Sequence, residues 1–416
     1  MLFPIFIFSQ GWEKTYGPGS GQSVRQTSDG GFIITGATGS IISGYVDIYL
    51  LKTNGNGDIL WTRTYGGNFY DFGYSVQQTT DGGYIVAGYT SLNSTGDYDV
   101  YLLKTNGNGD TLWTKTYGGN NDSKGFSVQQ TTDEGYIITG TTSSFGNDDD
   151  IYLIKTKGNG DTLWTKTYGG SYGDDYGRSV QQTTDGGYII TGHTYSISTL
   201  RDVYLIKTDS IGDTLWTKTY GGNYNDIGYS VQQTTDGGYI VTGYKSVNDV
   251  YLIKTDSIGD TLWTKTFGGS LTDGGISVEQ TTDGGFIIVG YTYSISNSTG
   301  DNDLYLIKTN GIGDTLWTKT FGGQYGDFGF SVQQTTDGGY IITGSTSLDG
   351  TNTNVYVIKT DANGSTSIKE ITIPNNNRKL IKIVDLLGRD INYPKKNIPY
   401  IEIYDDGTSQ KKIIIE

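Results

Sequence analysis

Residues 215–260 read LWTKTYGGNYNDIGYSVQQTTDGGYIVTGYKSVNDVYLIKTDSIGD, and close copies of this unit recur along the whole chain. Each copy carries one tryptophan, and successive tryptophans lie 47 to 54 residues apart, at Trp12, Trp61, Trp113, Trp164, Trp216, Trp263 and Trp317. Internal similarity at a fixed period indicates an architecture built from repeated structural units. The unit must therefore decide the fold.

Each unit contains four short runs rich in Val, Ile, Thr, Tyr and Trp and bounded by Gly, Asn and Asp, which is typical of β-strands. In the second unit they are residues 75–79, 83–88, 99–105 and 112–117. The alternation in YLIKT and WTKT predicts half-buried outer strands, whereas the apolar YIV run predicts a strand covered on both faces. Four such strands repeated every 50 residues or so predict a β-propeller.

The number of strands at the two ends of the chain predicts how the ring closes. The SVQQT, YIITG and YLIKT runs each occur seven times, the last copies within residues 331–360. No tryptophan strand follows them, but an unmatched WEKTYG precedes the first copy, at residues 12–17. We expect seven blades of four strands, with the N-terminal strand completing the last blade in a three-plus-one closure that leaves no exposed sheet edge.

The repeats resemble kelch-type propellers over residues 12–360, because a YIxxG strand is followed by an Asp-led strand, a hairpin and a Trp strand. They are more similar to the Gly-rich DGGYIITG…WTKTYGG repeats of secreted bacterial surface proteins. That resemblance implies a fold and an extracellular or outer-membrane location, and it implies no activity.

Both ends of the chain suggest export. The apolar run MLFPIFIFSQ is typical of the end of a secretory signal, so we assign residues 1–10 to a signal-peptide remnant and 11–362 to the propeller. Residues 363–416 have a different composition and resemble the type A C-terminal sorting domain of the type IX secretion system, here a small β-sandwich-like domain. The motif residues that carry this resemblance are Asp385, Leu387, Gly388, Arg389, Gly407, Lys411 and Lys412. The resemblance implies the type IX secretion machinery as a partner. The alternative is a small β domain that caps the propeller.

Charge and composition exclude several classes of function. The propeller region has 20 basic and 37 acidic residues, a net charge of −17, and fourteen of the basic residues occupy two repeated strand positions. We interpret these as edge-protecting lysines on outer strands. Without a basic face, nucleic-acid binding is not expected. The absence of Cys excludes disulfides and Cys-ligated metal, and no segment is long enough to span a membrane.

The turns of the repeat predict where a ligand binds. The TTDGG and TNGNGD turns share one face and hardly vary, whereas the loops on the opposite face vary in length and sequence. Variable loops on a rigid scaffold commonly carry function. The predicted ligand-binding residues on this variable face are Phe69, Tyr70, Phe72, Tyr98, Phe145, Tyr172, Tyr176, Tyr195, Tyr224, Tyr325 and Phe328. The alternative is that half or more of these side chains pack between blades.

Other candidate site residues have structural explanations. The acidic runs 147–150 and 301–303 could hold Ca²⁺, although neither has the spacing of a dedicated calcium loop, so no cofactor is assigned. His193 is the only histidine, and we interpret it as a solvated loop residue. Arg25 and Glu279 replace the first Gln of SVQQT on the innermost strand, through repeat drift or to pair across the channel. The hairpin before Trp216 differs in spacing from the sialidase Asp box, and that activity is disfavoured.

These observations favour a secreted, monomeric, non-catalytic protein that binds a glycan or a surface protein, as in adhesion, and no catalytic residues are assigned. A polysaccharide-active enzyme, a lyase or hydrolase using Tyr195 or Lys124 on the same face, is the alternative. A purely structural spacer is a third hypothesis.

Overall fold

The computed structural model describes residues 11–38, 46–67, 69–91, 97–145, 148–170, 173–196, 200–246, 249–294, 301–366, 380–385, 389–395, 398–404 and 409–412. These residues form thirty strands and no helix, which confirms the all-β prediction. The predicted signal segment, residues 1–10, lies outside them. Contacts divide the chain into two units, Met1–Ser367 and Ile368–Glu416.

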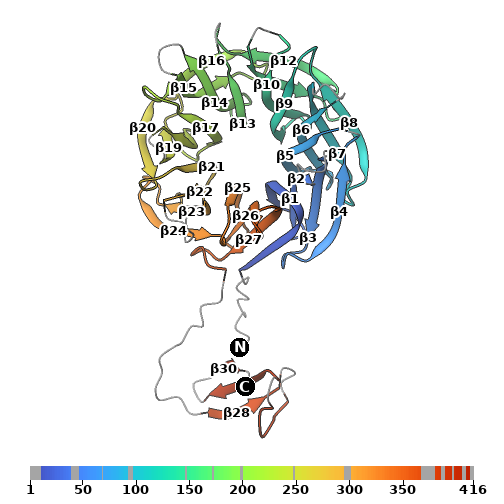
Figure 1. Cartoon of the computed structure of the whole chain (residues 1–416), viewed down its shortest axis with the longest axis vertical. Coiled ribbons are helices and arrows are strands. Elements are labelled where there is room, and N and C mark those ends of the chain that lie inside the picture. Colours follow the sequence, from blue (N-terminus) through green and yellow to red (C-terminus); the bar gives the residue numbers. More distant parts are fainter. Residues whose placement is uncertain are drawn as a thin grey trace. The chain divides into compact units, whose positions relative to one another are not determined.

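The first unit contains five four-stranded antiparallel sheets and one seven-stranded sheet arranged around a centre (Figure 1). We number the blades so that β5–β8 form blade 2 and β21–β24 form blade 6. The first strands are β1 (Trp12–Gln26), β5 (Asp71–Gln78), β9 (Ser123–Gln130), β13 (Tyr176–Gln182), β17 (Ile227–Gln233), β21 (Asp273–Gln280) and β25 (Asp327–Gln334). The second strands are β2 (Phe32–Thr38), β6 (Tyr84–Ser91), β10 (Tyr136–Thr142), β14 (Tyr188–Ser196), β18 (Tyr239–Lys245), β22 (Phe286–Thr292) and β26 (Tyr340–Ser347).

The outer two strands of each blade complete the sheets. The third strands are β3 (Ile48–Thr53), β7 (Tyr98–Thr105), β11 (Asp150–Thr156), β15 (Leu200–Thr208), β19 (Asp249–Thr255), β23 (Asp303–Thr309) and β27 (Thr353–Thr360). The fourth strands are β4 (Ile59–Tyr65), β8 (Thr111–Tyr117), β12 (Thr162–Tyr168), β16 (Thr214–Tyr220), β20 (Thr261–Phe267) and β24 (Thr315–Phe321). These sheets fit the predicted count of seven blades.

Strand β1 belongs to two blades at once. Its first half, Trp12 to Pro18, pairs antiparallel with β27, and its second half, Gly19 to Gln26, pairs antiparallel with β2. The seven-stranded sheet therefore runs β25-β26-β27-β1-β2-β3-β4, which is blade 7 followed by blade 1. The register shifts between Tyr16 and Pro18, where the strand passes from one blade to the other.

The hydrophobic core lies between blades. Each apolar cluster combines side chains of two neighbouring sheets, such as Ile85 and Leu102 of blade 2 with Ile138 and Ile154 of blade 3. The second strands are buried along their apolar runs, as predicted, and β10 is buried over its whole length. The third strands differ from the prediction. All of β23 is buried, because the next blade covers the polar side of the YLIKT run as well.

Each tryptophan is partly buried and links its blade to the next one. Trp61 of blade 1 packs against Tyr84 of blade 2, with ring centroids 5.9 Å apart and ring planes inclined at 60°, and also lies over Gly109. The equivalent ring pairs at the other six junctions have centroid distances of 5.8–6.0 Å. The same contact joins Trp12 to Phe32, so the last blade meets the first through the residue types that join the others.

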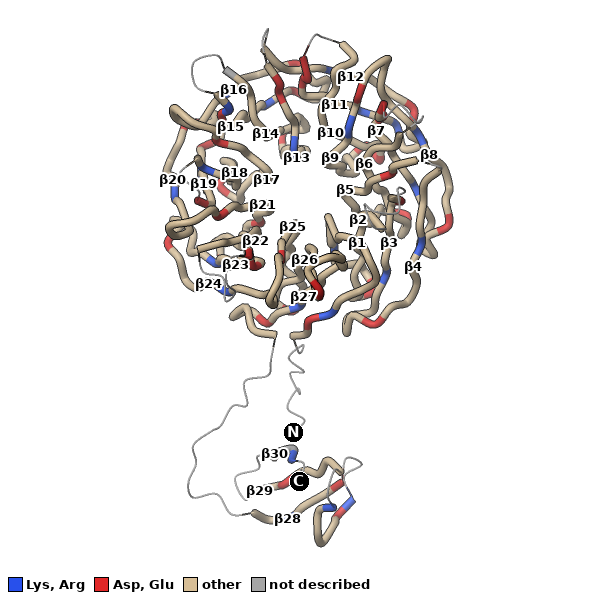
Figure 2. Tube along the Cα trace, in the orientation of Figure 1, with Lys and Arg blue, Asp and Glu red and all other residues tan. Residues whose placement is uncertain are grey.

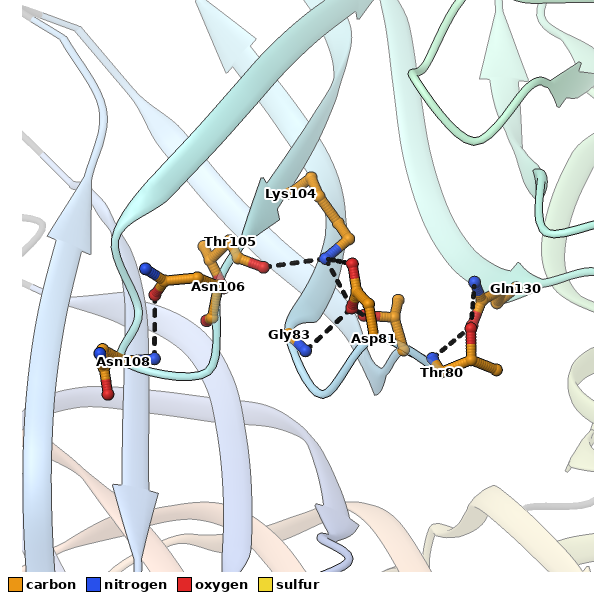
Figure 3. A network of polar contacts seen from close by, with 9 residues as sticks. Thr80, Asp81, Gly83, Lys104, Thr105, Asn106, Asn108 and Gln130 are labelled. Carbon is orange, nitrogen blue, oxygen red and sulfur yellow. Dashed lines mark hydrogen bonds and ion pairs between the residues drawn. The ribbon is translucent and has the colours of Figure 1, made fainter.

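The third-strand lysines do not protect a sheet edge, and that interpretation was wrong. Lys104 is 3% exposed, and its Nζ lies 2.9 Å from Asp81 Oδ2 in the TTDGG turn and donates to the carbonyl of Thr105 (Figure 3). Asp81 also accepts hydrogen bonds from Thr79 Oγ1 and from the backbone N–H of Gly83. The ammonium and the turn carboxylate therefore hold two strands of one blade together. The same ion pair occurs in all seven blades.

Lysine and arginine residues are spread around the ring among acidic residues (Figure 2). The fourth-strand cations pair with carboxylates of the next blade, as Lys115 does with Asp161 at 3.0 Å. The described part of the ring thus has no basic patch that would attract nucleic acid.

The second unit has a three-stranded antiparallel sheet of β28 (Leu380–Val384), β29 (Tyr400–Tyr404) and β30 (Ser409–Lys412), in that order. The described residues of the chain include no helix with the length and apolar character needed to cross a membrane.

Candidate ligand-binding face

Every first strand has a β-bulge at the same place. The register against the second strand shifts between the Gly and the Ser of the G-x-S-V-Q-Q run in all seven blades. A bulge leaves one residue unpaired and redirects its side chain. The seven bulge residues are Gln22, Tyr74, Phe126, Arg178, Tyr229, Ile276 and Phe330, and all are partly exposed.

Bulge residues of neighbouring blades contact one another. The rings of Tyr74 and Phe126 meet edge to face at 5.2 Å, and the Arg178 guanidinium lies over the rings of Phe126 at 4.7 Å and of Tyr229 at 5.8 Å. A continuous aromatic and cationic surface therefore crosses blades 2 to 5. Tyr89 extends it outward, because its ring packs on that of Tyr74 at 5.6 Å.

Blade 4 holds an unusual polar group on this surface. Tyr176 stacks on His193 at 5.0 Å, and its hydroxyl donates a 2.7 Å hydrogen bond to Asp149 Oδ2. His193 is 2% exposed within β14, so it is not the solvated loop residue that we expected. Burial is the main cause that lowers the pKa of His193 to about 3, and the charges of Arg178 and Arg201 contribute to this shift. The imidazole is therefore neutral at physiological pH.

The predicted aromatic residues divide into exposed and packed groups. Tyr70, Phe145, Tyr195 and Tyr224 are exposed, Tyr224 most of all at 64%. Partly buried positions are held by Phe69, Phe72, Tyr98, Tyr176, Tyr325 and Phe328, and Tyr172 lies outside the described residues.

Several of the packed rings support the loops around the bulge surface. Phe72 and Tyr98 contact Tyr89 at 4.9 and 5.0 Å, and Lys124 Nζ lies 4.6 Å above the Tyr98 ring. Phe328 packs against Tyr291 at 5.4 Å. These side chains can position the loops of the face whether or not they touch a ligand.

The channel is lined by the SVQ segments of the inner strands and has a cavity of about 240 Å³. At most junctions the first Gln accepts a hydrogen bond from the next blade, as Gln77 Oε1 does from the N–H of Gln130 at 2.7 Å. Glu279 takes the same role toward Gln334, whereas the Arg25 guanidinium donates to the carbonyl of Val24.

Arg25 and Glu279 do not form an ion pair within 4.0 Å in the described part of the channel. Burial raises the pKa of Glu279, and the charge of Arg25 opposes that rise. The two residues interact through the channel without direct contact.

Carboxylates also meet at the blade junctions of the variable face. Asp71 of blade 2 is 1% exposed and accepts from the N–H of Gly67, and Asp47 of blade 1 lies beside it at Gly66. Burial raises the pKa of Asp71, and the charge of Asp47 raises it further. Among the described residues, no three acidic or histidine side chains come together in a way that could hold a metal ion. Of the two proposed calcium runs, Asn147 lies outside those residues.

The proposed sorting residues lie partly in the second unit's turns. Arg389 donates from its backbone N–H and its Nε to the Asp385 carboxylate, at 3.0 and 2.7 Å. Lys412 Nζ lies 2.9 Å from Glu402 Oε2 across β29 and β30. Leu387, Gly388 and Gly407 lie outside the described residues, as does the side chain of Lys411.

Our sequence reasoning missed the bulge residues Tyr74, Phe126, Arg178, Tyr229 and Phe330. The signal for them was present, because a single position between an invariant Gly and an invariant Ser holds five different residue types in the seven blades. Position-specific variation inside a constant strand indicates a side chain that the fold leaves free.

Comparison with models of known protein families and with curated proteins finds no match. Solved structures do match. A crystal structure of Sqt1 from Chaetomium thermophilum is 9% identical over 83% of this chain and 97% of that chain, with a TM-score of 0.51. The WD40 domain of Pan2 from Neurospora crassa is 9% identical over 85% of this chain and 97% of that chain, with a TM-score of 0.47. At such identity the likeness to Sqt1 concerns the fold alone, and it confirms the β-propeller.

Proposed function

We propose that this protein is a secreted, non-catalytic recognition module that binds a glycan through the variable face of its propeller. The observation that carries the proposal is the row of bulge side chains across blades 2 to 5, which combines aromatic rings with one guanidinium. Aromatic side chains with polar neighbours suit the apolar faces and hydroxyl edges of sugars. The exposed rings of Phe145 and Tyr224 widen the same face.

A binding role is favoured over catalysis by the state of the polar groups. Catalytic acids and bases need a pKa near the working pH, whereas His193 has a pKa of about 3 and Tyr176 has its pKa raised by burial and by its bond to Asp149. A lyase or hydrolase remains the competing function to be tested on the same face.

The test is a panel of immobilised polysaccharides and glycans offered to the full-length protein, with calcium and with chelator, following both retention and released products. Tyr74→Gln and Tyr229→Gln should each weaken retention, because they remove aromatic surface but use the residue found at this position in blade 1. Leu262→Ala on the outer strand β20 removes an exposed apolar side chain and should change nothing. Release of products would show that the protein is an enzyme rather than a binding module. Capture of proteins with no glycan retained would show that its ligand is a protein.

We also propose that the β1–β27 pairing closes the ring three-plus-one, and that the C-terminal unit directs export by the type IX secretion system. The separate second unit and the Asp385–Arg389 ion pair at 2.7 Å support the export proposal. Residues 368–416 fused to a reporter should bring it to the surface or medium of a bacterium with this system. The Arg389→Ala fusion should remain in the cell. Equal export of both fusions would show that this turn has no role in export.

A further inference from the structure

Blade 4 concentrates the departures from the repeat. It holds the only histidine of the chain, His193, and two of the four arginines of the propeller, Arg178 and Arg201. The other blades place Gln, Tyr, Phe or Ile at the Arg178 position, and Ala, Tyr, Thr or Ser at the His193 position. Random drift would scatter such changes over seven blades, but here they occur in one blade, where both arginines lie near His193 and Arg178 directly precedes the channel-lining Ser179.

Three buried nitrogen atoms of this cluster lack hydrogen-bond partners in the described structure. The Nε of Arg178 is buried and makes no hydrogen bond in the described structure, and the same holds for both ring nitrogens of His193. The carboxylate of Asp149 in this blade accepts a hydrogen bond from the Tyr176 hydroxyl. Buried donors without partners are costly, so each needs an explanation, and a ligand group is one that fits.

The setting of Arg178 defines what kind of group could bind. Rings of Phe126, Tyr176 and Tyr229 lie 4.7, 5.3 and 5.8 Å from its guanidinium carbon, and the side chain stays partly exposed. Rings packed around a guanidinium restrict its orientation, and its planar N–H fork matches the two oxygens of a carboxylate or a sulfate ester.

The charges around the cluster are of both signs. Arg178 and Arg201 both act on His193, and Asp149 and Asp174 both act on Tyr176. Of these groups, Arg178 is the cation that lies among the aromatic rings of the bulge surface, so an anion would pair with it.

We propose that Arg178 is an anion subsite at the channel mouth, which binds the carboxylate or sulfate group of an acidic saccharide while the sugar ring contacts the neighbouring aromatic side chains. This inference rests on the proposed glycan-binding function and narrows its ligand to acidic saccharides. Arg178 supplies a charged, two-pronged donor, and the neutral His193 lies behind the Tyr176 ring on which it stacks.

The test uses the full-length protein without a histidine tag and three probes: trigalacturonate, its methyl ester, and a sulfated carrageenan trisaccharide. Calorimetry should show trigalacturonate or the sulfated probe bound at least about tenfold more tightly than the neutral ester, as expected for one charge-assisted contact. The two anionic probes distinguish carboxylate from sulfate ester. Arg178→Tyr restores the residue of blades 2 and 5 and should abolish the preference, whereas Arg63→Lys on an outer strand should keep it.

His193 gives a second readout, because a single histidine yields a single set of imidazole resonances. The anionic probe should shift these resonances in the natural protein and not in Arg178→Tyr. Equal binding of acid and ester, or an Arg178→Tyr protein that keeps the preference, would overturn the subsite. The panel result with Tyr74→Gln and Tyr229→Gln would then still stand, so failure of the subsite differs from failure of the function. Retention of a polyglutamate peptide with none of the saccharides bound would overturn both.

Discussion

At the scale of single residues, the most repeated interaction is a buried ammonium facing a turn carboxylate. The bonds from Thr79, Lys104 and Gly83 lower the pKa of Asp81 to about 2 although burial opposes them, and its charge is the main counterpart of a lysine that is 3% exposed. The lysine position looked like edge protection in the sequence because YLIKT alternates. Only the three-dimensional packing shows that the long side chain turns inward to the TTDGG turn.

Asp81→Asn should therefore lower the free energy of unfolding by about 1–2 kcal/mol, because it leaves Lys104 buried without its counter-charge while Asp81 itself is more than half-exposed. Urea unfolding followed by tryptophan fluorescence measures the change. The matched control is Asp110→Asn in the same blade, whose contact with Arg63 is long at 3.9 Å and solvent-exposed, and it should shift stability by less than about 0.5 kcal/mol. Equal losses in the two variants would contradict the structural role of the buried ammonium.

At the scale of the strand, the β-bulge in each first strand depends on the glycine that lies opposite it in the second strand. A Cβ at Gly243 of β18 would lie 1.8 Å from the carbonyl oxygen of Ile227, which no side-chain adjustment can relieve. The invariant Gly of the YIxxG run thus permits the close backbone approach that the bulge requires. The sequence predicted these strands correctly, but a register shift has no signature in hydrophobic alternation, and so the side chains that it redirects were missed.

Gly243→Ala should destabilise the protein by about 3 kcal/mol, since the backbone of β17 must move. Gly222→Ala, in the loop between β16 and β17, has open space around its Cβ and should cost less than about 0.5 kcal/mol. Thermal unfolding of both variants provides the comparison. A Gly243→Ala protein as stable as the Gly222→Ala protein would show that the strands can separate without loss.

At the scale of the whole molecule, stability depends on two sets of aspartates with opposite behaviour. The turn set, including Asp29, Asp81 and Asp236, has pKa values lowered to about 2 from an ordinary 3.8. The junction set, including Asp71 and Asp327, has raised pKa values because burial disfavours the charged form.

The free energy of unfolding should rise as pH falls from neutral toward about 4, because protonation removes the penalty of the buried junction carboxylates, whose pKa is higher in the folded state. It should fall between about pH 4 and pH 2, where the unfolded chain takes up protons that the turn carboxylates resist in the folded state. Chemical unfolding at a series of pH values measures this curve. A stability that declines steadily from pH 7 downward would contradict the roles of the junction set.

The proposed ring closure gives a second prediction for the whole molecule. Removing residues 1–17 takes away the strand that pairs with β27 and the contact of Trp12 with Phe32. Loss of the Trp12 and Tyr16 packing alone should cost about 4 kcal/mol, and the exposed edge of β27 should promote association. Calorimetry and sizing of the truncated chain are the measurements. Removal of residues 368–416 is the control and should leave the unfolding of the propeller unchanged.

The sequence was sufficient for the all-β propeller, for the order of strands and for a blade count that the sheets fit, because these follow from counting a periodic pattern. It was insufficient for His193. Its position after a strand suggested a solvated loop, whereas β14 continues to Ser196 and buries the imidazole beneath the Tyr176 ring. Such continuations depend on neighbouring strands, which no local pattern specifies.

The uniform junctions have a consequence for how such a chain can change over generations. Every blade meets its neighbour through the same serine and glutamine hydrogen bonds, such as Ser75 to the N–H of Val128, and through the same tryptophan contact. One blade can therefore replace another, because duplication or recombination within the gene yields a unit whose two sides already pack against any neighbouring blade. Recombination can then reorder the seven bulge side chains around the mouth, and with them the recognition surface, without inventing a new packing solution.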